Sequence, residues 1–148
     1  MVSIIPINLA VEDLLSEVVW LPYPKHPNLL FRVAVREVEA WLLAHRDAFA
    51  KFLAIPPRLI PANVDAINDP KQLLILLAGK SKKRQLREAL VPSSRSTAKV
   101  GPDYNGQLII FVEDFWNMKI AAQNSFSLQR AMNEIKNFNP LIRAKVST

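Results

Sequence analysis

The residues Leu29-Leu-Phe-Arg-Val-Ala-Val35, followed directly by Arg36-Glu-Val-Glu-Ala-Trp-Leu-Leu-Ala44, decide the predicted fold. The first run is apolar, is β-branched toward its end and is broken only by Arg32, which predicts a buried strand. The second run is rich in strong helix formers, and apolar residues at helical spacing continue it to about Ala54. A strand that passes straight into a helix favours an α/β fold.

A second β-like run, Ser3–Leu9, contains Pro6, which removes a hydrogen-bond donor and restricts the run to an edge or a first strand. The remaining apolar patterns predict helices. They cover Val11–Trp20, a segment opened by Asp69-Pro70, a short helix that ends near Leu90, Gln107–Trp116 and Leu128–Phe138. We therefore predict a helix-rich α/β domain with five or six helices and a small sheet, two-stranded or incomplete.

Gln107–Trp116 is the ambiguous element, because Leu-Ile-Ile-Phe-Val also suits a buried strand. Its apolar residues recur at a spacing of three and four, which favours a helix. The preceding residues, Val91–Asn105, contain two prolines, a glycine and a Ser/Thr-rich centre, and predict a long loop. Loops of this length in compact domains are often functional.

The composition fits one domain over residues 1–148, with a flexible tail over 139–148. No apolar run approaches the roughly 18 residues that cross a bilayer, so we expect no membrane partner. Met1–Ala10 has no basic region and no small-residue cleavage site, and we expect no signal peptide. The chain has no cysteine, which fits a cytoplasmic location.

Positive charge is concentrated in Lys80–Arg87, which contains no acid, within a chain of formal charge +6. Such a cluster favours a polyanion, and DNA or RNA in particular. Four of its side chains are predicted to contact phosphates without reading bases: Lys82, Lys83, Arg84 and Arg87. A solvated helix face explains the same pattern equally well.

Glu37 and Glu39 stand where the predicted strand ends and the next helix begins. Open α/β sheets place their ligands at this end of their strands. Carboxylates in such a position suit Mg²⁺ or Mn²⁺, which prefer oxygen ligands. The alternative is that both acids only start a helix, where negative charge is stabilising.

Arg95 and Lys99 lie in the predicted loop beside Ser96 and Thr97. Two cations and two hydroxyls near an acid cluster could bind a phosphate and offset developing negative charge. A solvated loop is the alternative interpretation.

Taken as a set, several of these motifs resemble an uncharacterised Toprim-like family, related to the Toprim domains of overcoming-lysogenization-defect nucleases, topoisomerases and primases. The resemblance extends over about residues 28–138. Its motifs are the strand before Arg36 to Ala44, then Asp69 to Lys71, Ser96 to Tyr104 and Ser125 to Leu128. It implies a metal-dependent nuclease with Glu37, Glu39 and Lys99 as catalytic residues and Glu12, Glu37 and Glu39 as metal ligands.

The chain departs from that family because it contains no Asp-x-Asp motif and no acid between Glu17 and Glu37. Two-metal cleavage of a phosphodiester needs several carboxylates around ions roughly 4 Å apart. Glu12, Glu37 and Glu39 would hold one Mg²⁺ at most. Three functions follow as expectations: a degenerate metal-dependent nuclease, a non-enzymatic nucleic-acid-binding module that uses residues 80–87, or a protein-interaction domain.

Overall fold

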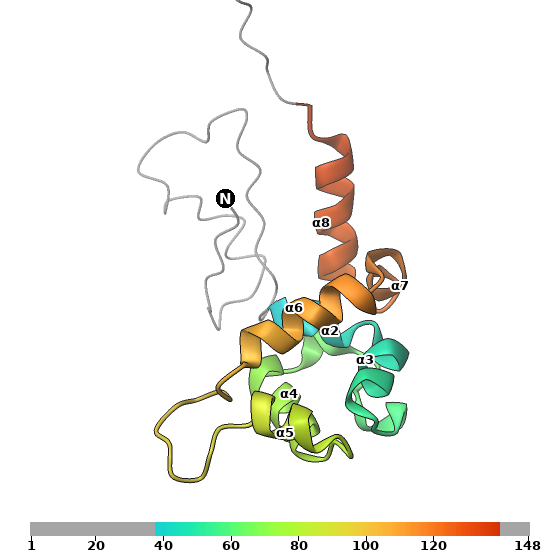
Figure 1. Ribbon diagram of the computed structural model, residues 1–148. Helices are drawn as coiled ribbons and strands as arrows, with labels where there is room; N and C mark the ends of the chain where they lie inside the picture. The colour runs from blue at the N-terminus through green and yellow to red at the C-terminus, as the bar shows by residue number, and fades with distance from the viewer. Residues whose placement is uncertain (1–37, 140–148) are drawn as a thin grey trace, which may run out of the picture.

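The computed structural model describes residues 38–139, and every regular element in this range is helical (Figure 1). The α-helices are α2 (Val38–Leu43), α3 (Arg46–Leu53), α4 (Pro70–Gly79), α5 (Arg84–Leu90), α6 (Tyr104–Asp114), α7 (Met118–Ala122) and α8 (Phe126–Asn137). The 3-10 turns η2 (Pro57–Leu59) and η3 (Val64–Ala66) connect α3 to α4. Between residues 38 and 139, no helix has both the length and the apolar character needed to cross a membrane.

The predicted α/β class is wrong for this part of the chain, because residues 38–139 contain no strand and form no sheet. Their apolar residues recur at helical spacing, so each segment buries one face of a helix against its neighbours. The two predicted strands, Ser3–Leu9 and Leu29–Val35, lie outside the described residues. So do the helix predicted over Val11–Trp20 and residues 140–148 of the predicted tail.

The predicted helix from Arg36 to Ala54 is two helices, α2 and α3, which are separated at Ala44 and His45. His45 leaves the helical conformation, with φ −85° and ψ 66°. Its Nδ1 accepts the Asn117 N–H at 3.0 Å, and the Asn124 side chain donates to the Ala44 carbonyl at 2.8 Å. Hydrogen bonds to the chain around α7 therefore hold the break, and a single helix would not form them.

Helix α4 starts as the sequence predicts. The Asp69 carboxylate accepts the Gln72 N–H at 2.8 Å, and Pro70 occupies the first turn, where its missing N–H costs nothing. At the other end, Gly79 is the last residue of the helix and Lys80 is its C-cap.

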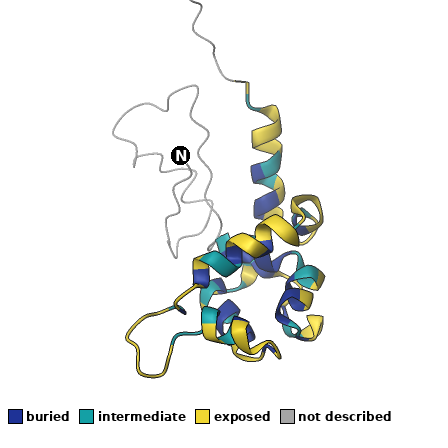
Figure 2. Ribbon diagram, in the orientation of Figure 1, coloured by how far each residue is buried: buried dark blue, intermediate teal, exposed yellow. Residues whose placement is uncertain are grey.

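Two further helices begin at side-chain caps. Ser125 accepts the Leu128 N–H at 3.2 Å and opens α8, which corresponds to the helix predicted over Leu128–Phe138 and begins two residues earlier, at Phe126. Asn117 accepts the N–H groups of Lys119 and Ile120 and opens the five-residue α7, which was not predicted. Figure 2 shows α8 buried in its first turns and exposed toward its end.

The core is built around phenylalanines from α3 and α6. The rings of Phe49 and Phe111 meet edge to face with centroids 4.8 Å apart, and Phe52 lies 5.3 Å from Phe111. Trp41 and Trp116 pack against this core, and the Trp116 indole donates to the Trp41 carbonyl at 3.1 Å. Both tryptophans are partly buried.

Candidate nucleic-acid interface

The net positive charge of the chain is concentrated in one segment. Residues 70–102 contain eight of the 19 lysines and arginines and only one of the 13 acids, Glu88. Their formal charge of +7 exceeds the +6 of the whole chain, so all other residues together are close to neutral. The segment comprises α4, α5 and the loop that leads to α6.

Most of these cations are at the surface. Lys80, Lys82, Lys83 and Arg84 are exposed around the start of α5, and Arg87 is partly buried. Arg95 and Lys99 are exposed in the loop of residues 91–103, which Figure 1 shows extending away from the helices and Figure 2 shows exposed along most of its length. Most side chains of the basic cluster are therefore accessible to solvent.

Two of the predicted phosphate-binding side chains also have bonds within the protein. The Lys83 Nζ donates to the Phe52 carbonyl at 2.8 Å, and Arg87 donates to the Ser81 carbonyl. Ser81 is itself buried and donates to the Leu53 carbonyl at 2.5 Å. The carbonyls of Phe52 and Leu53 end α3, where a cation opposes the negative end of the helix dipole. Lys83 therefore stabilises the fold as well as adding surface charge.

The remaining cations of the cluster have fewer or weaker bonds within the protein. Arg84 pairs with Glu88 at 2.7 Å on the exposed side of α5. The hydrogen bond to Glu88 raises the pKa of Arg84 above its ordinary value. Exposed pairs of this kind are weak and open readily. Among the described residues, the Lys80 and Lys82 side chains form no hydrogen bond or ion pair. Lys80, Lys82 and Arg84 are therefore available to a polyanion.

The loop is closed at its base by two backbone hydrogen bonds. The Gly101 N–H donates to the Leu90 carbonyl at 2.9 Å, and the Asp103 N–H donates to the Ala89 carbonyl at 3.1 Å. A side chain at Gly101 would collide with the Ala89 backbone, so this close approach requires glycine. Within the described chain, the charged groups of Arg95 and Lys99 have no partner.

A shallow depression of about 580 Å³ lies between the base of this loop and the helices α4 and α5. Its lining includes Gly79, Arg87 and Ser93. The start of the loop and the basic helix thus share one continuous surface.

Glu39 is the one predicted metal ligand within the described residues. It is buried on α2, at 6% exposure, and its Oε1 accepts the Tyr104 hydroxyl at 3.0 Å and lies 3.5 Å from the Lys71 Nζ. Glu12 and Glu37 fall outside the described residues. Among residues 38–139, no three Asp, Glu, His or Cys side chains are grouped so as to hold a metal ion.

A second polar network surrounds the carboxylate of Asp65 and had no counterpart in the sequence prediction. Asp65 accepts the hydroxyls of Ser125 and Ser127 at 2.8 and 3.0 Å and the Ser127 N–H at 3.1 Å. The Trp41 indole completes the network by donating to the Ser127 hydroxyl at 2.8 Å. Because these polar groups satisfy one another at the start of α8, the cluster joins η3, α2 and α8 and offers no open site. The Ser-x-Ser pattern before a helix was its only sequence signal.

No protein-family model matches the chain, and no curated protein or solved structure is significantly similar to it. The Toprim-like resemblance therefore stays a prediction. The strand that it implies before Arg36 lies outside the described residues. Its Asp69 and Ser125 motifs lie at the starts of helices α4 and α8.

Proposed function

We propose that this protein binds nucleic acid through its phosphate backbone, using the exposed cations of α5 and the adjoining loop. The observation behind the proposal is the concentration of charge: residues 70–102 have a net +7, and most of their cations are exposed. A surface of this kind attracts phosphates regardless of base sequence, because it releases condensed counterions from the nucleic acid.

The cations of this surface differ in whether they also form bonds within the protein. Lys82 and Arg84 lack buried partners, so they contact phosphates without loss of protein stability. Lys83 and Arg87 contribute charge while bonded to backbone carbonyls. Arg95 and Lys99 extend the surface along the loop. We expect each phosphate contact to add to affinity, with no base specificity from the cations themselves.

The test is fluorescence anisotropy of labelled single-stranded and duplex oligonucleotides with the full chain, in the presence of a chelator. Binding should weaken steeply as salt rises from about 50 to 200 mM. The Lys82→Ala, Arg84→Ala double variant should lower affinity and reduce the salt slope by about one for each contact removed. Binding that persists under chelation separates this function from one that needs Mg²⁺ or Mn²⁺.

The matched control is the Lys119→Ala, Lys136→Ala double variant, which removes the same charge from exposed positions on α7 and α8. It should bind nearly as well as the unaltered protein. An equal loss in both double variants would mean that only net charge matters, and it would refute an interface on α5. Absence of binding at low salt would refute the function itself and leave the protein-interaction alternative.

A further inference from the structure

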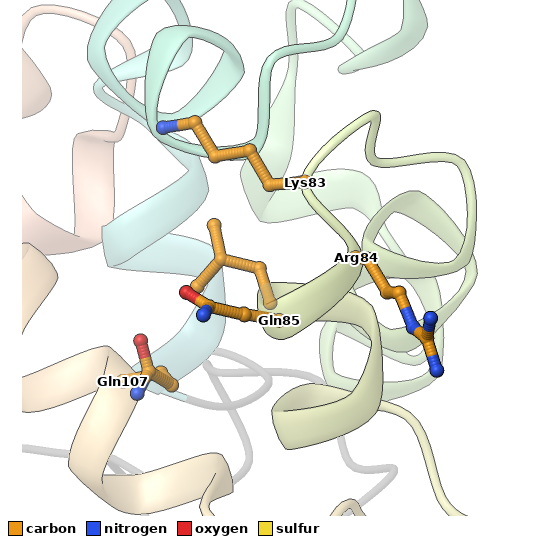
Figure 3. Close-up of a pocket in the computed structure, with 5 residues that line it drawn as sticks. Lys83, Arg84, Gln85 and Gln107 are labelled. Carbon is orange, nitrogen blue, oxygen red and sulfur yellow. The ribbon is translucent and has the colours of Figure 1, made fainter.

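A hollow of about 300 Å³ lies between α5 and α6, directly beside the basic surface. Its lining consists of Lys83, Arg84, Gln85, Leu86 and Gln107 (Figure 3). The amides of Gln85 and Gln107 lie on the same side of α5, whereas the Arg84 guanidinium extends to the opposite side. The hollow therefore combines an apolar side chain, Leu86, with two amides, and the ammonium group of Lys83 is directed away from these amides toward α3, where it donates to the Phe52 carbonyl.

The two amides retain hydrogen-bonding capacity. Gln107 uses one N–H of its amide, which donates to the Asp103 carboxylate at 2.7 Å, and its second N–H and its carbonyl remain. Within the described residues, the Gln85 side chain has no hydrogen-bond partner. A glutamine amide presents a donor and an acceptor side by side, which matches the edge of a nucleobase.

We propose that this hollow receives one unpaired nucleobase of a nucleic-acid strand bound on the basic surface. The inference rests on the proposed function and adds to it a preference for single strands. Leu86, of which 8% is exposed, offers an apolar contact to the face of the base, and Gln85 and Gln107 bind its edge. The volume is at the lower end of the range for small-ligand pockets, which suits one base.

The position of the cations fits this arrangement. Lys83 lines the hollow, and the exposed Lys82 precedes it in the chain, so the phosphates of the bound nucleotide have positive charge close by. A base that is stacked and paired in a duplex cannot reach the amides, whereas single-stranded bases are free to turn outward. The hollow thus recognises the base, and the surrounding surface binds the backbone.

The experiment compares a short thymidine oligonucleotide with an abasic oligonucleotide of the same length and charge, by anisotropy with the full chain. The unaltered protein should bind the thymidine strand about tenfold more tightly, the discrimination typical of one well-placed amide contact. Gln85→Ala, alone or with Gln107→Ala, should remove most of that difference and leave abasic binding unchanged. Unchanged abasic binding also shows that the variant is folded.

Gln129→Ala, at an exposed position of α8, is the matched control and should keep the full preference. Equal affinity of the unaltered protein for both oligonucleotides would refute the base pocket while leaving backbone binding intact. Failure to bind either oligonucleotide at low salt would instead refute the proposed function, and the pocket with it. Displacement of the strand by an equal concentration of thymidine monophosphate would assign the hollow to free nucleotides and overturn the single-strand proposal.

Discussion

Tyr104 donates its hydroxyl hydrogen to the Glu39 carboxylate over 3.0 Å, a bond between residues 65 positions apart in the chain. Both residues are buried, at 5% and 6% exposure. The bond fixes the start of α6 against α2, and Lys71 of α4 approaches the same oxygen at 3.5 Å. One carboxylate thereby joins three helices.

Tyr104→Phe should destabilise the protein by about 1–3 kcal/mol, because the buried Glu39 side chain would lose a hydrogen-bond donor. Denaturant unfolding followed by circular dichroism measures the change. Combining it with Glu39→Ala, which removes the acceptor, completes a double-mutant cycle in which the two losses should not add. A Tyr104→Phe protein as stable as the original would show that the hydroxyl contributes nothing to the fold.

A substitution at Glu39 tests the predicted nuclease activity separately from nucleic-acid binding. Glu39→Gln keeps the volume of the side chain and an acceptor for Tyr104, and it removes the charge that a metal ion requires. Since Glu39 is buried, we expect nucleic-acid binding within about twofold of the original. Nicking of supercoiled plasmid with Mg²⁺ or Mn²⁺ that disappears in Glu39→Gln would support the nuclease prediction; equal nicking in both proteins would exclude Glu39 from any catalytic role.

Alanine substitutions at two glycines should change the stability of the protein in opposite directions. Gly101→Ala would place a methyl group against the Ala89 and Leu90 backbone, and we expect a loss of about 1–3 kcal/mol. Gly79→Ala meets no atom within 4 Å in the last turn of α4, and should add about 0.5–1 kcal/mol because alanine loses less backbone entropy on folding. Thermal melts of both variants provide the comparison. Equal effects in the two would contradict a close approach at Gly101.

His45 should make the protein less stable in mildly acidic solution. Partial burial lowers its pKa below the ordinary 6.5, outweighing the opposite effect of Asp47, and its Nδ1 accepts the Asn117 N–H. The unfolded chain therefore takes up a proton first, so the stabilisation is complete above about pH 6.5 and is lost as the pH falls through the lower folded value. A positive charge at the N-terminus of α3 is also unfavourable.

We expect the melting temperature to fall between pH 7.5 and pH 5.5, and His45→Asn to reduce that fall. Asparagine keeps an oxygen acceptor at a helix N-cap and does not titrate. His26 is present in both proteins, so its contribution cancels in the comparison. The same decrease in the variant would assign the pH dependence to other groups.

Local signals predicted one helix start accurately. Asp69-Pro70 marks the start of α4 by chemistry that acts within four residues, and the structure confirms it, whereas α8 begins at Phe126, two residues before the predicted Leu128. The helical spacing in Gln107–Trp116 was also sufficient, although α6 begins earlier, at Tyr104. The break at His45 was missed because its hydrogen bonds come from Asn117 and Asn124, far away in the chain.

For the candidate site, too, some features could be predicted from the sequence and others could not. Composition was enough to predict that Lys82 and Arg84 are exposed. It did not reveal that Lys83 and Arg87 bond to the carbonyls of Phe52 and Ser81, because backbone acceptors have no signature in the sequence. The hollow between Gln85 and Gln107 was equally hidden, since packing alone brings α5 against α6.

The closed base of the loop has a consequence for protein engineering. Because Gly101 and Asp103 bond back to Leu90 and Ala89, the helices meet the loop at a fixed junction whatever its length. Doubling a flexible loop costs only about 0.6 kcal/mol in closure entropy, so residues 93–99 should accept an inserted peptide or reporter tag. Natural insertions and deletions should be tolerated here for the same reason, and we expect relatives of the chain to differ most in length in this loop.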